Sequence, residues 1–152
     1  IKATCARLLT QLGVRDPLVS AETGSGKLLR SRLVKEPAPP EVLAEIEGKE
    51  RLIDARLRVR DRVFPAPDFV LPTGRWPTPA EVLGVFRESR DATIAFLETT
   101  ALDLSRYAAP HPTFGMLNGY QWAYFMAVHA LRHVDQIREI QSAAGYPGAG
   151  PS

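Results

Sequence analysis

The sequence predicts an all-α fold, a helical bundle whose helices are joined by long proline-rich connections. Apolar residues recur every three or four positions in four separate segments, which is the spacing of helices that bury one face. Most of the 13 prolines fall between these segments or at their first residues, where proline does not interrupt a helix. We expect one domain over residues 1–145 and a flexible tail over residues 146–152.

The N-terminal half contains two of the four predicted helices. Residues 1–13 carry leucines at helical spacing and end at Gly13, a common helix stop. A connection over residues 14–40 follows, rich in glycine and proline. The segment PPEVLAEIEGKERLIDARLR then predicts one helix that ends at about Arg58 and is weakened by Gly48.

The C-terminal half contains the two clearest helices. Thr78 is placed to cap a helix with Pro79 at its first position and Glu81 completing a capping box, and this helix runs to about Thr100. The segment LDLSRYAAPHPTFG, residues 102–115, predicts a loop. The last helix spans about residues 118–143 and is the longest and most periodic segment.

Composition and charge exclude several classes of function. Lys plus Arg exceed Asp plus Glu by only 19 to 17, so we expect no nucleic-acid partner. No apolar run approaches the roughly 20 residues that span a bilayer, so no membrane partner is expected. Cys5 is the single cysteine, which rules out an internal disulfide and favours a cytoplasmic location. The glycines near Lys27 resemble a phosphate-binding loop, but Ala21 and Leu28 stand where that motif needs glycine and a hydroxyl.

The motif HALRH places His129 and His133 four positions apart on the last helix. Side chains at this spacing lie on one helix face, close enough for two imidazoles to bind one metal ion. The alternative is a pair of partly buried histidines satisfied by hydrogen bonds. Ala130 follows His129 where a zinc peptidase needs glutamate, so peptidase chemistry is not expected. His111, in the loop, is the third histidine, and it is either a further ligand or a turn residue.

The C-terminal portion resembles the DinB-like superfamily of damage-inducible, metal-binding four-helix bundles, which includes the bacterial thiol S-transferases. The residues that carry this resemblance are FRESRDATIAFLETTALDL and HPTFGMLNGYQWAYFMAVHALRHVDQI, in which an H-P-x-x-G loop leads into a helix with H-x-x-x-H. The resemblance implies an up-down bundle with a metal held by three histidines. His129 and His133 match two of them. The third should precede or lie in the helix at residues 1–13, which contains no histidine. We therefore expect the first bundle helix and this ligand to lie upstream of Ile1.

The same resemblance implies an activity, although the residues assign no catalytic side chain. A divalent ion, zinc, nickel or iron, would activate a small-molecule thiol for attack on an electrophilic substrate. Gln136 could orient a ligand or form an interhelical hydrogen bond, whereas Arg132 and Asp135 are expected to point into solvent. The alternative function is a non-enzymatic stress-related or interaction protein with a structural or degenerate histidine site. Exposed apolar side chains of an incomplete bundle would then favour a homodimer.

Overall fold

The computed structural model describes residues 36–59 and 78–146. The helix expected at residues 1–13, most of the two proline-rich connections and the tail beyond Tyr146 lie outside these ranges. The described elements, in chain order, are α3 (Pro40–Glu45), α4 (Lys49–Arg58), α5 (Pro79–Thr99), the 3-10 helix η2 (Leu104–Arg106), β1 (Ala108–His111), β2 (Gly115–Asn118) and α6 (Gly119–Ser142). The fold is mostly helical, which confirms the predicted all-α class.

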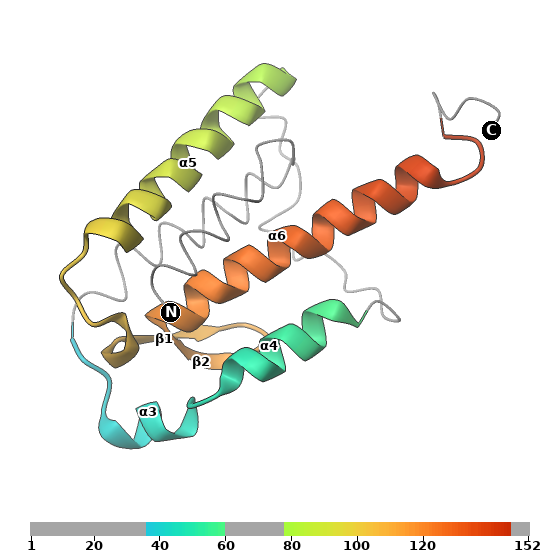
Figure 1. The fold of residues 1–152 in the computed structure, drawn as a ribbon. Coiled ribbons are helices and arrows are strands. Elements are labelled where there is room, and N and C mark those ends of the chain that lie inside the picture. The colour runs from blue at the N-terminus through green and yellow to red at the C-terminus, as the bar shows by residue number, and fades with distance from the viewer. Residues whose placement is uncertain (1–35, 60–77, 147–152) are drawn as a thin grey trace.

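Helix α6 is the central element of the described structure (Figure 1). Helix α4 packs alongside its N-terminal half, and the two-stranded hairpin of β1 and β2 lies at its N-terminal end. The C-terminal half of α6 extends beyond the end of α4. The functional candidates His129 and His133 therefore lie on α6 near the place where α4 ends.

The single helix expected before Arg58 is in fact two helices, so that part of the prediction was wrong. Gly48 adopts a left-handed backbone conformation with φ of 72°, which breaks the helix between α3 and α4. Ile46 lies in this break and is nevertheless fully buried. Its carbonyl accepts a hydrogen bond of 2.6 Å from the side chain of Gln121 on α6, so the break is fixed to the central helix.

The start of α5 follows the prediction. The Thr78 hydroxyl accepts a hydrogen bond from the backbone N–H of Glu81, and the Glu81 carboxylate accepts one from the backbone N–H of Thr78. Pro79 occupies the first helical position. This reciprocal cap satisfies two of the N–H groups that every helix start leaves without an intrahelical partner.

The loop expected over residues 102–115 contains regular structure that the sequence analysis missed. After η2, strand β1 pairs antiparallel with β2, with Ala109 opposite Leu117 and His111 opposite Gly115. Gly115 has a φ of 69°, which suits a three-residue hairpin loop closed by a glycine in the left-handed region. The strands are only four residues long and one contains Pro110, so no alternating pattern marks them in the sequence.

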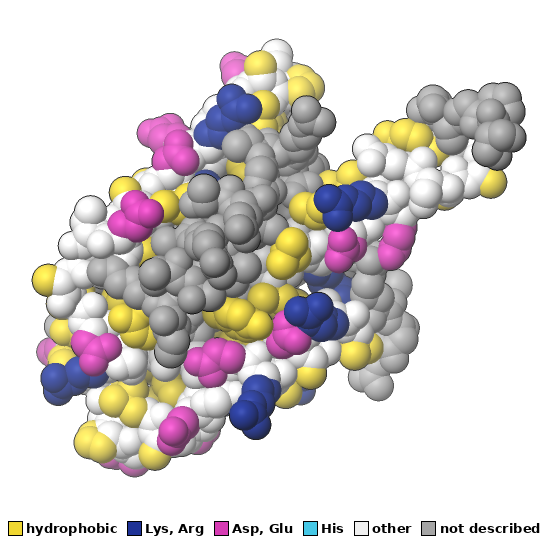
Figure 2. Space-filling model, viewed as in Figure 1, with side chains coloured by type: hydrophobic (Ala, Val, Ile, Leu, Met, Phe, Trp, Pro, Cys, Tyr) yellow, Lys and Arg dark blue, Asp and Glu magenta, His cyan; other side chains and the backbone are white. Residues whose placement is uncertain are grey.

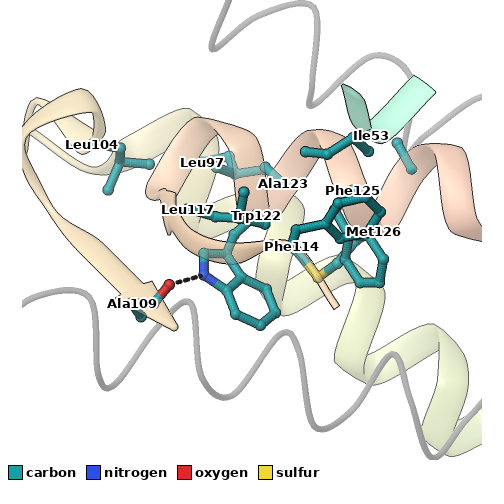
Figure 3. Packing of buried hydrophobic residues seen from close by; sticks show 11 residues of the cluster. Ile53, Leu97, Leu104, Ala109, Phe114, Leu117, Trp122, Ala123, Phe125 and Met126 are labelled. Atoms are coloured by element: carbon teal, nitrogen blue, oxygen red, sulfur yellow. Dashed lines mark hydrogen bonds between the residues drawn. The ribbon is translucent and has the colours of Figure 1, made fainter. Parts of the chain in front are cut away.

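The hydrophobic core lies where α6, the hairpin, α4 and the end of α5 meet (Figure 3). Leu97, Leu104, Leu117 and Ile53 are fully buried in it. Trp122 donates its indole N–H to the carbonyl of Ala109 at 3.2 Å, which satisfies the polar edge of a buried aromatic ring. The core thus fixes the hairpin against the first turns of α6.

On the face shown in Figure 2, the described acidic and basic side chains are interspersed. This agrees with the near balance of charges in the sequence. Within residues 36–59 and 78–146, no helix is both long enough and apolar enough to cross a membrane.

Candidate metal centre

Two contacts fix the N-terminal end of α6, the helix that carries the candidate ligands. Asn118 and Gln121 form a capping box, in which each side chain accepts a hydrogen bond from the other residue's backbone N–H. Gly119 packs so closely on Leu104 that an added Cβ would lie 2.9 Å from the Leu104 Cβ. Helix α6 therefore starts at a defined residue, and its side chains have a defined orientation.

The side chains of His129 and His133, called here the histidine pair, converge on each other. Their Nε2 atoms lie 3.1 Å apart, and the ring centroids are 4.5 Å apart with the planes at 80°. Two imidazole nitrogens bound to one ion at about 2.0–2.1 Å would be about 3.3 Å apart in a tetrahedral site and about 2.9 Å apart at neighbouring octahedral positions. The spacing of the pair lies between these two values.

Both members of the pair favour the neutral form. The pKa of His129 is lowered to about 4, mainly by burial, with smaller contributions from His133, His111 and Arg132. Burial also lowers the pKa of His133, although a hydrogen bond with the Gln136 side chain acts in the opposite direction. Only a neutral imidazole has a lone pair for a metal, so near pH 7 the pair does not have to lose a charge before binding a cation.

His111 is a turn residue in this structure, which is one of the two roles considered from the sequence. Its Nδ1 accepts hydrogen bonds from the backbone N–H groups of Thr113, at 3.0 Å, and Phe114, at 3.3 Å. Burial lowers the pKa of His111 to about 4, which keeps Nδ1 available as an acceptor. In the neutral ring the proton then resides on Nε2, so neither nitrogen offers a free lone pair.

Among the residues that the structure describes, no third ligand lies at the pair. In the two described ranges, no group of three or more histidine, cysteine, aspartate or glutamate side chains is arranged to hold a metal ion. Cys5 lies outside these ranges. The described residues therefore provide two donor atoms.

Aromatic rings connect the pair to the hairpin, a relationship that the sequence analysis missed. Phe125 stacks on His129 with ring centroids 5.1 Å apart and an interplanar angle of 16°. His111 meets the same phenylalanine edge-on at 4.3 Å. The spacing of Phe125 and His129 by four positions would have suggested the first contact, but nothing in the sequence places His111 against Phe125.

Arg132 was expected to be solvated, and this prediction was wrong. Its Nη1 donates to the carbonyls of Leu57, at 2.9 Å, and Val59, at 2.7 Å, at the end of α4 where helical carbonyls lack intrahelical partners. Asp135 is exposed, as expected, and forms a 3.5 Å ion pair with Arg138. Gln136 contacts His133 on the same helix, and its expected role in orienting a ligand stays a prediction.

The described features are those of a helical protein with a pair of neutral histidines on its central helix. The chain belongs to the DinB superfamily, whose sequence pattern matches residues 23–137. The uncharacterized protein YuaE of Bacillus subtilis (strain 168) is 30% identical over 132 residues, which cover 84% of this chain and 74% of that protein. No solved structure matches the chain.

Proposed function

We propose that the protein binds a divalent metal ion through His129 and His133 and uses it in the transfer of a small-molecule thiol to an electrophile. The observation that carries the proposal is the 3.1 Å separation of the two Nε2 atoms. This separation allows both nitrogens to bind one ion after small movements of the rings. The proposal extends beyond membership of the DinB superfamily, which by itself assigns no chemistry.

The charge of the described donors also fits the proposal. Two neutral imidazoles leave the full charge of a divalent ion uncompensated, so the remaining coordination positions would favour water or an anion. A bound divalent ion would supply a Lewis acid that lowers the pKa of a thiol, so that thiolate would be present near pH 7. The chain assigns no side-chain nucleophile to this reaction.

The residues of the chain would have two tasks. His129 and His133 bind the ion, and Gln136 orients His133 through its hydrogen bond. In the transfer, the thiol gives its proton to solvent and its sulfur forms a bond to the electrophilic carbon, while the leaving group departs with the electrons of the broken bond. The reaction is a substitution and needs no oxidant or reductant.

Metal binding is tested by titrating the metal-free protein with zinc and nickel ions in a calorimeter. Wild type should bind one ion, and the variants His129→Gln and His133→Gln should each lose most of the affinity. Asp135→Asn is the matched control, because it removes an exposed carboxylate next to the pair on the same helix. Equal loss in Asp135→Asn would indicate nonspecific binding to surface charge, and unchanged affinity in both histidine variants would overturn the assignment.

The transferase step is tested separately with the loaded protein. A simple thiol and a chromogenic aryl chloride would be mixed with wild type, and the rate of thioether formation compared with that of the His133→Gln variant. A rate that depends on the bound ion and on the pair supports the proposal. A stoichiometric metal with no thiol-dependent rate would leave the metal a structural role only.

A second candidate function is a helical interaction protein with a degenerate histidine site. The pair can form one Nε2 to Nε2 hydrogen bond, and His133 has a further partner in Gln136. Both rings are therefore satisfied in part without an ion. This candidate predicts no metal-dependent change in the calorimeter, so the first experiment distinguishes it from the transferase.

A further inference from the structure

The ring of His129 is held from one side by an aromatic contact. Phe125 lies one turn earlier on α6, and its ring is nearly parallel to the imidazole, at 16°, with centroids 5.1 Å apart. A stacked neighbour restricts rotation about the bond that joins the imidazole to Cβ, because rotation would lose this contact. The direction in which His129 presents its Nε2 therefore depends on where Phe125 lies.

Phe125 is in turn fixed by the hairpin. His111 contacts it edge-on at 4.3 Å, and Phe114 and Trp122 meet it at 5.8 Å and 6.0 Å. His111 itself cannot turn freely, because its Nδ1 accepts two backbone hydrogen bonds in the hairpin loop. A continuous series of ring contacts thus runs from the hairpin turn through Phe125 to the histidine pair.

We propose that Phe125, held by His111, is the positioning residue that directs the Nε2 of His129 toward the Nε2 of His133. The hairpin then contributes to the site without supplying a donor atom. The consequence for metal binding rests on the proposed function, whereas the orientation of the imidazole can be measured without any ion. Outer contacts that orient metal ligands typically change affinity by about 10- to 100-fold when they are removed.

The test compares Phe125→Leu with Phe114→Leu. Both phenylalanines are buried and belong to the same cluster, but only Phe125 is stacked on His129. The two variants should lose similar packing energy, so a general loss of stability affects both equally. His111→Asn supplements them, because asparagine can accept from the amide two residues later and so keep the turn while removing the ring. His111→Phe keeps an aromatic ring at this position but removes the hydrogen-bond acceptor of the turn.

The first measurement is the long-range proton–nitrogen NMR spectrum of the imidazole rings in the metal-free protein. Phe125→Leu should shift the ring signals of His129, His111→Asn and His111→Phe should each shift them less, and Phe114→Leu should leave them near their wild-type positions. The second measurement is the affinity for cobalt ions, which should fall about 10-fold or more in Phe125→Leu and less than about 3-fold in Phe114→Leu.

The outcomes separate the two proposals. If wild type binds no cobalt, the proposed function fails and the imidazole spectra alone decide whether Phe125 positions His129. If wild type binds cobalt and the two leucine variants lose affinity equally, Phe125 has no special role and the inference is overturned. Unchanged ring signals of His129 in Phe125→Leu would overturn the inference as well.

Discussion

The side-chain amide of Gln121 donates a 2.6 Å hydrogen bond to the carbonyl of Ile46, a residue 75 positions earlier in the chain. Both residues are almost completely buried. The same glutamine caps the start of α6 through its side-chain oxygen. One residue therefore joins the break between α3 and α4 to the first turn of the helix that carries the histidine pair.

Replacement of this glutamine by methionine should be strongly destabilising. Gln121→Met has a similar volume but removes the short side-chain hydrogen bond to the buried Ile46 carbonyl, which keeps only the 3.3 Å bond from the Lys49 N–H, and it removes the acceptor of the Asn118 N–H. We therefore expect a loss of about 2–3 kcal/mol in the free energy of unfolding. Urea denaturation followed by circular dichroism measures it. Gln141→Met, on the exposed end of the same helix, is the control and should change stability by less than about 0.5 kcal/mol. Similar losses in both would show that the buried hydrogen bond has little weight.

Gly48 and Gly84 should respond to alanine with opposite signs. An added Cβ meets no atom within 4 Å at either position, but Gly48 has a φ of 72° and Gly84 lies within α5. Gly48→Ala should destabilise the protein by about 1–2 kcal/mol, because an L side chain is strained in the left-handed region. Gly84→Ala should stabilise it by up to about 1 kcal/mol through its higher helix propensity. Thermal unfolding of the two variants checks the signs, and a stable Gly48→Ala would contradict the left-handed break.

The free energy of unfolding should decrease as the pH is lowered from about 6.5 to about 4. The pKa values of His111 and His129 fall from 6.5 to about 4 on folding, mainly through burial. Between these values the unfolded chain binds more protons than the folded chain, so acid favours unfolding. We expect a loss on the order of 1–2 kcal/mol per histidine, reduced from the full linkage value by solvent screening.

Urea titrations at several pH values, with a chelator present, measure this decrease. His111→Asn cannot titrate in this range and keeps an acceptor for the turn, so its stability should depend less steeply on pH than that of wild type. If the free energy of unfolding of His111→Asn depends on pH as steeply as that of wild type, His111 does not contribute to the decrease.

Arg132 should stabilise the end of α4. Arg132→Met removes the donor to the carbonyls of Leu57 and Val59, and we expect a loss of about 1–2 kcal/mol. Hydrogen exchange should become faster at the last amides of α4. Arg138→Met is the matched control, since its ion pair with Asp135 is 3.5 Å long and its side chain is 73% exposed, and exposed pairs contribute little. No change in exchange at α4 would contradict the role of Arg132.

Local signals in the sequence were sufficient for the features that depend on neighbouring residues. The capping box of Thr78 and Glu81, the extent of α6 and the shared face of His129 and His133 all follow from spacings of three or four positions. The hairpin was missed because its stability depends on packing against α6, through contacts such as that of Trp122 with Ala109. Packing with distant segments is not visible in a strand of four residues.

The same distinction explains the errors around the candidate site. Ile140 lies seven positions after His133, at helical spacing, yet this residue is 60% exposed. Arg132 was predicted to lie in solvent because nothing in the sequence shows that α4 ends beside it. The helical spacing of apolar residues shows which face of a helix is apolar. How far along the helix this face is covered depends on where the neighbouring helix ends.

Strand β2 leads directly into α6. The strand pairing of the hairpin therefore determines which way the side chains of α6 face around the helix axis. Asn118 is both the last residue of β2, opposite Ala108, and the N-cap of α6. One inserted residue at this junction would rotate every later side chain by about 100° around the helix axis, and His129 would no longer face the same neighbours. Insertions between Leu117 and Trp122 should therefore be far more damaging than insertions beyond Ser142, where α6 has already passed the residues that cover it.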